Sequence, residues 1–235
     1  THTHTKQLVR HQLEKFQKSQ GIPVTGTVTE ETLQALDLQQ PVDVPVAIPV
    51  QQVTLEQVQK IMPHCDPVKV KEYLPMLNAA LKLADLNTSR RIAAFLAQVA
   101  HESGQLRYLV DITSGAAQEG NKQLGNVKPG DGSRYKGRGP LQLTGRTAYT
   151  EAGKALSVNL VDQPDQASAP DLGFRVAAWM WSSLKLNRFA DQGDLDSITF
   201  SLTGGYVGKA DRDRYFKVAL DTLSSPADKS GSQVR

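Results

Sequence analysis

The sequence contains very little cysteine and no long hydrophobic run. Cys65 is the only cysteine among 235 residues, so an internal disulfide is excluded. No apolar stretch approaches the ~20 residues that a membrane-spanning helix needs. The first residues are polar, so no signal peptide is visible. We therefore expect a chain that folds without disulfides and carries no membrane span.

An excess of charge of one sign is also missing. Lysine and arginine together number 27, against 24 aspartates and glutamates, which gives a net charge of +3. This mildly basic balance favours approach to an anionic polymer, but it is too small to indicate a nucleic-acid partner. With 39% apolar and 22% charged residues, the chain is expected to bury one good core and to carry a small appendage.

Motifs for metals and common cofactors are absent too. His101-Glu102 begins like a zinc-protease motif, but Gln105 stands where its second histidine would be. The other histidines show no ligand spacing, and Gly137-x-Gly139 lacks the rest of a nucleotide-binding motif. The serine-hydrolase pattern Gly-x-Ser-x-Gly does not occur. We therefore predict no metal and no cofactor.

The patterns that are present divide the chain into three parts. Residues 1–37 are expected to form a small helical domain, because apolar residues recur at helical spacing before Gly21 and again after Thr29. Residues 38–52 are expected to be a linker, because a proline at every fourth position favours an extended backbone. These prolines are Pro41, Pro45 and Pro49. Residues 53–235 are expected to form the main domain.

Helical patterns dominate the main domain. Helices are predicted after Thr54 and at residues 68–86, 90–103, 147–156, 172–184 and 211–223. Thr54 with Gln57 forms a capping-box pattern, and Pro75 is expected to break or kink its helix. Residues 111–138 are polar and rich in glycine, which indicates long loops. Because no run of alternating strands occurs, we predict a mainly α fold.

Glu102 stands at the end of a predicted helix with an apolar face. Phe95, Val99 and Glu102 are four and three residues apart, so they share that face. A carboxyl group at the end of an apolar stripe is partly removed from water, which favours its protonated form. A general acid in glycoside cleavage needs that form. A glutamate at a helix end is often only solvated, so the assignment depends on a second motif.

The second motif is a polar stretch a few dozen residues downstream. It reads Tyr135-Lys136-Gly137-Arg138-Gly139-Pro140-Leu141-Gln142-Leu143-Thr144-Gly145-Arg146. Its first two glycines let a ligand approach the backbone closely, and its ring, guanidinium, amide and hydroxyl suit a hydroxyl-rich polymer. Together with the segment His101-Glu102-Ser103-Gly104, this stretch resembles the signature of glycoside hydrolase family 19, the chitinases and the phage endolysins related to them.

The resemblance covers about residues 53 to 223 and is closest to the phage branch. It implies a lysozyme-like fold in which two helical lobes flank a cleft with walls of glycine-rich loops. It also places the proton donor at Glu102, puts Gln142 in the cleft and gives Thr144 the role of holding the attacking water. Thr203 stands where the family usually has asparagine, which puts one substrate contact in doubt.

An inverting glycoside hydrolase also needs a second carboxylate, ~6.5–9.5 Å from the acid, to activate a water. Glu119 ranks first, because its flanking residues resemble the Tyr-Glu-Gly-Arg…Leu-Gly-Asn loop of related endolysins. Asp111 ranks second, because it lies nine residues after the acid, where other phage members carry glutamate. Asp111 could instead bind sugar or steady a water. A loop carboxylate is usually just solvated, so both assignments are hypotheses.

The remaining aromatic and basic residues of the motif region have more than one reading. Tyr135 and Tyr149 are expected to stack on sugar faces, whereas Trp179 and Trp181 are expected to pack in the core. Arg138 is expected mainly to pair with a carboxylate and to hold the loop geometry, with sugar contact as a secondary role.

The N-terminal segment resembles the second half of a peptidoglycan-binding domain; a two-helix spacer is the alternative. The whole resemblance implies a modular endolysin that cuts peptidoglycan between N-acetylmuramic acid and N-acetylglucosamine with inversion. We expect a monomer that is made in the bacterial host cytoplasm and acts on the wall after release. A chitinase and a non-catalytic glycan-binding protein remain the alternatives.

Overall fold

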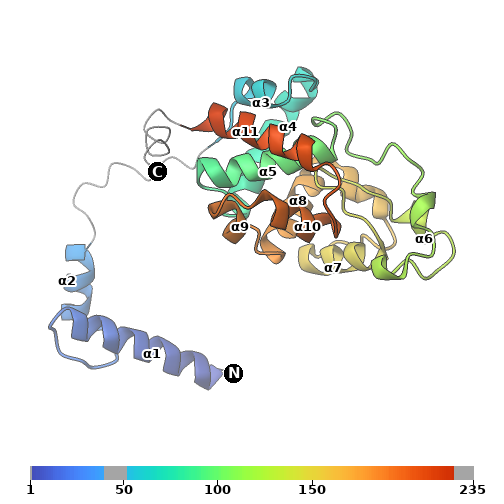
Figure 1. The fold of residues 1–235 in the computed structure, drawn as a ribbon. Helices are drawn as coiled ribbons and strands as arrows, with labels where there is room; N and C mark the ends of the chain where they lie inside the picture. Colours follow the sequence, from blue (N-terminus) through green and yellow to red (C-terminus); the bar gives the residue numbers. More distant parts are fainter. Residues whose placement is uncertain (1, 40–51, 225–235) are drawn as a thin grey trace. The chain divides into compact units, whose positions relative to one another are not determined.

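The computed structural model describes residues 2–39 and 52–224, which belong to two separate units (Figure 1). The first unit spans residues 1–48 and the second spans residues 49–235. The predicted linker, residues 38–52, lies mostly outside the described residues. Within the described ranges, no helix is long and apolar enough to cross a membrane.

The N-terminal unit contains two helices, α1 (His2–Ser19) and α2 (Glu30–Gln39), which confirms the two helices predicted there. The contact between them is built around a buried amide. Gln17 donates from Nε2 to the Thr32 hydroxyl at 2.9 Å and to the Thr27 carbonyl at 2.8 Å. Its Oε1 accepts the Thr25 N–H at 2.9 Å. Because Gln17 and Thr32 are both fully buried, this polar network orders the turn between the helices.

The larger unit is helical throughout, and its described residues contain no strand beyond isolated bridges. Its α-helices are α3 (Leu55–Ile61), α4 (Pro67–Leu83), α5 (Ser89–Glu102), α6 (Asp131–Arg134), α7 (Arg146–Leu156), α8 (Pro170–Ser183), α9 (Asn187–Asp191), α10 (Leu195–Thr203) and α11 (Lys209–Leu223). Short 3-10 turns occur at Ala116–Gln118, Lys122–Leu124 and Pro164–Ser168. The predicted mainly α fold is confirmed.

Local signals set several helix starts. Thr54 and Gln57 form the predicted capping box, with side-chain bonds of 3.2 and 3.0 Å to each other's N–H. Thr88 caps α5 by accepting the Arg91 N–H at 3.2 Å. Of the two outcomes predicted at Pro75, a break or a kink, the break does not occur, because α4 continues past this residue. The helix survives the missing backbone bond because packing of its buried face holds it in place.

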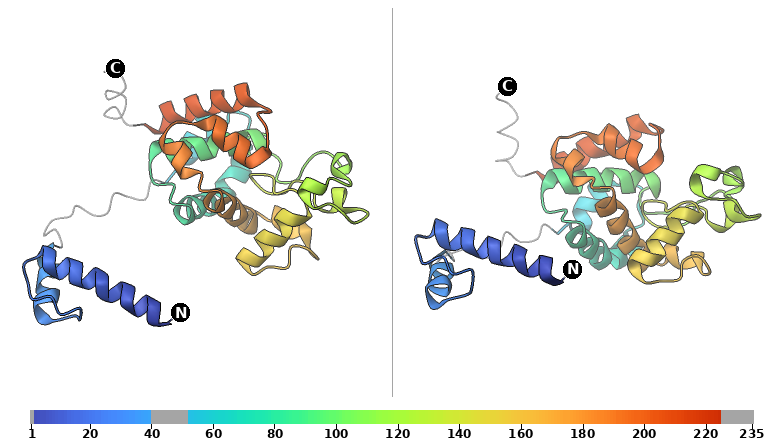
Figure 2. Two further views of the ribbon diagram at one scale, coloured as in Figure 1. Left: turned by 60° about the horizontal axis from the view of Figure 1, so that its bottom comes forward. Right: turned by 90° about the horizontal axis from the view of Figure 1, so that it is seen from below.

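Two hydrophobic clusters make the two lobes. The larger cluster surrounds α5, where every residue from Ile92 to Ala100 is buried and Phe95 meets Trp181 edge to face at 5.4 Å. The smaller cluster lies beneath α7 and includes Tyr149, Leu160 and other side chains of that lobe. Figures 1 and 2 show α7 beside α8, on the side away from α3 and α11. The polar end of α5 therefore points out of a rigid, well-packed lobe.

Candidate active site

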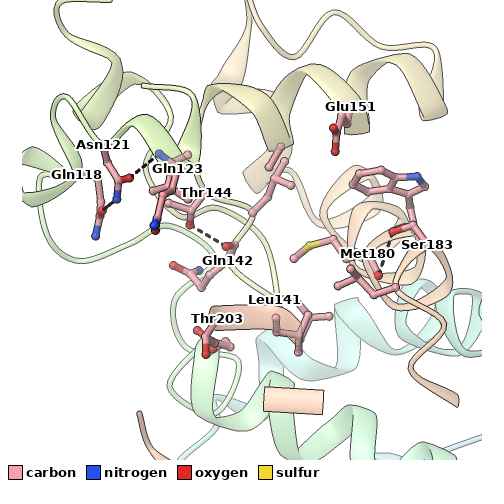
Figure 3. Close-up of a pocket in the computed structure, with 17 residues that line it drawn as sticks. Gln118, Asn121, Gln123, Leu141, Gln142, Thr144, Glu151, Met180, Ser183 and Thr203 are labelled. Atoms are coloured by element: carbon pink, nitrogen blue, oxygen red, sulfur yellow. Dashed lines mark hydrogen bonds between the residues drawn. The ribbon is translucent and has the colours of Figure 1, made fainter. Parts of the chain in front are cut away.

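A cleft of about 720 Å³ contains Glu102 (Figure 3). One side comes from the ends of α5 and α10, another from α7 and α8, and the third from loops of the motif region. The lining residues include, besides Glu102, the polar side chains Gln118, Asn121, Gln123, Gln142, Thr144, Glu151, Ser183 and Thr203. A half-open groove lined by amides, hydroxyls and carboxylates suits a carbohydrate.

Glu102 is held by an ion pair that the sequence did not reveal. Its side chain is 18% exposed, and Oε1 accepts a hydrogen bond from Arg212 Nη2 at 2.6 Å. The Arg212 side chain is itself 3% exposed and also donates to the Gln98 amide oxygen and to the Val207 carbonyl. The environment of Glu102 is therefore more polar than its apolar helix face suggested, and α11 fixes the direction of its carboxylate.

A second pair of neighbours repeats this arrangement. His101 Nδ1 lies 2.7 Å from Asp211 Oδ2, so consecutive residues of α5 meet consecutive residues of α11. Gly208 precedes α11 at a φ of +80°, and a side chain there would collide with the His101 ring. The close approach of the two helix ends therefore requires glycine at that position.

The motif stretch folds into a tight turn that presents Gln142 and Thr144 to the cleft. Arg138 and Leu143 exchange backbone hydrogen bonds of 3.1 and 2.9 Å across the turn. Gln142 adopts a left-handed φ of +56°, and its amide donates to the Gly139 carbonyl at 3.0 Å. A side chain at Gly137 would strike that amide, which explains this glycine. Figure 3 shows Gln142 and Thr144 side by side at the cleft.

The structure corrects the expected roles of the two tyrosines. Tyr135 is 1% exposed and Tyr149 is 0% exposed, so neither offers a ring face to a sugar. Their hydroxyls donate to the carbonyls of Val161 and Lys136, and their rings lie 5.2 Å apart in the core of the smaller lobe. Burial raises the pKa of Tyr149 to about 12.

Two other expectations concern the tryptophans. Trp181 is fully buried, as predicted, and its indole N–H donates to Asn187 at 2.8 Å. Trp179 packs against the smaller hydrophobic cluster, as predicted, but it is only half-buried and also lines the cleft. A tryptophan at the wall of the cleft can stack on a sugar ring, so Trp179, rather than either tyrosine, is the candidate for that role.

Arg138 has the contacts of a scaffold residue. It is buried, and Nη1 donates to the Arg134 carbonyl at 2.7 Å and to the Tyr149 hydroxyl at 3.0 Å. Its Nη2 lies 3.1 Å from an Asp165 oxygen. It is not among the cleft-lining residues, which agrees with the expectation that it holds the loop. Thr203, by contrast, lines the cleft at the end of α10.

Glu119 and Asp111, the two candidates for the catalytic base, are not among the residues that line the cleft. Their hydrogen-bond partners differ. Both oxygens of Glu119 accept backbone N–H groups, from Gly130 at 2.9 Å and from Gly132 at 3.1 Å. Asp111 uses only Oδ1, which accepts the N–H and the hydroxyl of Thr113 at 2.8 and 2.9 Å. Its backbone N–H donates to the Gly137 carbonyl at 2.8 Å, so Asp111 lies beside the motif stretch.

The loop that carries Glu119 is fastened by a buried ion pair. Asp131, at the start of α6, is 1% exposed and accepts two hydrogen bonds of 2.8 Å from Arg146. The Arg146 guanidinium holds the pKa of Asp131 below its usual range, mainly through these hydrogen bonds. Arg146 begins α7, so the pair ties the loop to that helix.

Comparison with known proteins decides the family. The sequence profile of the chitinase class I family, glycoside hydrolase family 19, matches residues 72–191, which is half of the chain. The chain belongs to glycoside hydrolase family 19. A peptidoglycan-binding domain profile also matches residues 4–36, so this family 19 chain carries that domain at its N-terminus.

Relatives of the family 19 domain come from plants and bacteria. An endochitinase of Arabidopsis thaliana is 37% identical over 117 residues, which span 49% of this chain and 40% of that enzyme. The chain thus matches about two fifths of the length of this curated plant relative. A glycosyl hydrolase family 19 domain-containing protein of Haemophilus influenzae is 26% identical and covers 69% of this chain and 93% of its own length.

A solved structure gives the same fold. Chitinase C from Streptomyces griseus superposes with a TM-score of 0.60 at 23% identity, covering 73% of this chain and 92% of that enzyme. The predicted lysozyme-like family 19 fold is therefore confirmed. Within the described residues, no group of three or more potential metal ligands occurs.

Sequence reasoning missed several members of the cleft of this family 19 domain. These are Gln118, Asn121 and Gln123 of the loop before α6, Glu151 of α7, and Ser183 of α8. The contact of Arg212 with Glu102 was not predicted either. Nothing in the local pattern distinguishes these polar residues from solvated ones, because they meet only through the packing of distant segments.

Proposed function

We propose that the chain is a peptidoglycan hydrolase of the endolysin type that cleaves the β-1,4 bond between N-acetylmuramic acid and N-acetylglucosamine. The observation that carries this proposal is a family 19 cleft with a rigidly held carboxyl group in a chain that also carries a peptidoglycan-binding domain. The module at the N-terminus favours the bacterial wall over chitin, because it would concentrate the enzyme on that polymer.

The acid in the proposed reaction is Glu102. When Glu102 is protonated on Oε2, it donates that proton to the glycosidic oxygen as the bond to the anomeric carbon breaks, while Oε1 keeps its hydrogen bond from Arg212. Arg212 directs the carboxyl group into the cleft, and its hydrogen bond at 2.6 Å limits the rotation of that group. A fixed donor loses little entropy on reaching the transition state, which is the contribution expected of the α5–α11 contact.

The proposed base is Asp111, and Glu119 is the alternative. Both oxygens of Glu119 already accept backbone N–H groups, so taking a proton from water would compete with the loop contacts. Within the described residues, the side-chain contacts of Asp111 involve Oδ1 alone, which leaves Oδ2 for a water. The water, positioned with the Thr144 hydroxyl, attacks the anomeric carbon from the opposite face, and the configuration inverts.

The test is digestion of purified peptidoglycan followed by mass spectrometry of the products. We expect new reducing ends at N-acetylmuramic acid from the parent protein and far fewer from Glu102→Gln. Reducing ends at N-acetylglucosamine would contradict the bond assignment. Released peptides without new sugar ends would overturn the glycosidase assignment itself.

A parallel digest of colloidal chitin separates the first alternative. Its support is the Arabidopsis thaliana relative, which is an endochitinase. Faster cleavage of chitin than of peptidoglycan would favour a chitinase. If the parent protein binds either polymer but cleaves neither, the chain is a glycan-binding protein whose second carboxylate is not functional.

A further inference from the structure

The charges that line the cleft are unevenly balanced. Among the described lining residues, Glu102 and Glu151 are the carboxylates, and none is lysine, arginine or histidine. The charge of Glu102 is met by Arg212 at 2.6 Å. The Glu151 side chain makes no hydrogen bond or ion pair to another residue within ranges 2–39 and 52–224. One carboxylate of the cleft is therefore left without a cation.

The unpaired carboxylate lies at one end of the cleft. Glu151 extends from α7 towards the cavity, and Met180 and Ser183 of α8 lie on the same side (Figure 3). Thr203 and Leu141 lie on the opposite side in this view. Trp179, which is half-buried, also lines the cleft from α8. The α7–α8 end therefore combines a carboxylate, an indole and a hydroxyl.

The nearby cations do not neutralise Glu151. Arg146 lies five residues earlier on α7, but its guanidinium makes two hydrogen bonds of 2.8 Å to Asp131. Lys154 lies three residues later on the same helix and makes no ion pair with Glu151 in the described structure. A solvated glutamate on a helix surface would need no partner. Glu151 differs because it lines a cavity that must hold the substrate.

We propose that Glu151, with Trp179 and Ser183, forms a subsite that selects a substrate unit bearing a primary ammonium group, either on the sugar itself or on the stem peptide attached to it. This inference rests on the proposed function and names a chemical feature of its substrate. The indole offers an apolar face to a sugar ring, Ser183 offers a hydroxyl, and the carboxylate accepts hydrogen bonds from the ammonium. The ammonium belongs either to de-N-acetylated glucosamine in the strand or to a diamino acid of the stem peptide.

The expected preference is moderate because Glu151 is exposed to solvent. An exposed ion pair contributes little, which corresponds to a preference of about threefold to fivefold. Salt screens such a pair, so the preference should shrink at high ionic strength. A neutral N-acetyl group has no charge to pair with the carboxylate, and it gains nothing from Glu151 beyond a hydrogen bond.

The test compares two soluble substrates of equal length: a fully N-acetylated glucosamine oligosaccharide and its partly de-N-acetylated counterpart. The measured quantity is kcat/KM for the de-N-acetylated substrate divided by kcat/KM for the N-acetylated substrate. This ratio is determined for the parent, for Glu151→Gln and for Glu72→Gln, a control on the exposed face of α4. We expect Glu151→Gln to lower the ratio by about threefold to fivefold through KM, and Glu72→Gln to leave it unchanged. An equal ratio in all three proteins would overturn the subsite.

Two further arms make the outcome specific. The rate of digestion is measured for peptidoglycan whose stem-peptide amines have been acetylated and for untreated peptidoglycan. If acetylation slows digestion by the parent but not by Glu151→Gln, the ammonium belongs to the peptide. Binding of both oligosaccharides to Glu102→Gln, with and without Glu151→Gln, is measured by calorimetry. If the parent cleaves nothing, the proposed function fails, but the binding comparison still decides the subsite: identical affinities for both sugars reject it.

Discussion

Two regions of the catalytic unit, the α5 helix and the loop before α7, hold their carboxylates in opposite ways. On the α5 side, Glu102 ends a helix that is almost completely buried, and Arg212 directs its carboxylate from α11. On the loop side, Glu119 and Asp131 use their oxygens to fasten the chain itself, by accepting backbone N–H groups or a guanidinium. Identical chemical groups thus point into the cleft in one region and act as structural anchors in the other.

The difference follows from the local secondary structure. At the C-terminal end of a helix the unsatisfied backbone groups are carbonyls, which a carboxylate cannot satisfy, so the terminal carboxylate of α5 is free to point into a cleft. A long loop lacks such internal bonds, and its N–H groups need other acceptors. Carboxylates in a loop are therefore drawn into structural hydrogen bonds. A carboxylate in a loop can therefore be assigned as a catalytic base only after the hydrogen bonds that its oxygens already accept have been identified.

The largest expected effect comes from the helix side. Glu102→Gln keeps the shape of the side chain and its contact with Arg212 but removes the transferable proton. We expect kcat on peptidoglycan to fall by a factor on the order of 10³ with little loss of stability. Glu72→Gln, an exposed change on α4, is the matched control and should keep full activity. Retention of about a tenth of the parental rate in Glu102→Gln would remove it as the general acid.

The second effect compares the two loop carboxylates directly. Asp111→Asn should lower kcat by about 10²-fold without changing the unfolding midpoint, because it removes a base and keeps the turn at Thr113. Glu119→Gln should mainly lower stability, by about 1–3 kcal/mol, because one oxygen that holds a loop N–H becomes an amide nitrogen. Kinetics and urea unfolding of both variants measure this contrast. The reverse pattern would restore Glu119 as the base.

The third effect changes stability but not catalysis, and it concerns the ion pair between Asp131 and Arg146 and its dependence on pH. The pKa of Asp131 is lower in the folded chain than in the unfolded chain, so its ion pair stabilises the fold above about pH 3.9, and this stability is lost as the pH falls through the folded value. At pH 7, Asp131→Asn should cost about 1.5–3 kcal/mol in urea unfolding. The difference from the parent should shrink towards pH 3.

A surface pair provides the control for the anchor. Asp171 lies 3.7 Å from Arg175 on α8 and is largely exposed, so Asp171→Asn should change the free energy of unfolding by less than about 0.5 kcal/mol at either pH. If both aspartate variants lose the same stability, or if the loss in Asp131→Asn is as large at pH 3 as at pH 7, the buried pair is not the loop anchor described here.

Local sequence signals predicted the helices well. Thr54, Thr88 and the glycine after α1 marked real helix ends, because capping depends on residues that are neighbours in the chain. Pro75 does not break its helix, because the packing of α4 outweighs one missing backbone bond. The short helices α6 and α9 and the longer α10 were not predicted.

Side-chain burial was the least predictable property of the site. Tyr135 and Tyr149 have the chemistry of sugar-stacking residues, yet their rings fill the smaller lobe, while Trp179 reaches the cleft. A tyrosine suits both places, because its ring is apolar and its hydroxyl needs a partner in either. The sequence does not indicate which of these aromatic side chains will be covered by other segments and which will face the cleft.

The sequence by itself determined the mainly α fold, the position of Glu102 at a helix end and the family 19 motifs, because each depends on residues close together in the chain. Only the tertiary structure decided that Arg212 meets Glu102, that Glu119 holds a loop, and that Glu151 is left without a cation. These facts depend on which distant segments pack together. Packing is set by the whole core at once, so no single motif encodes it.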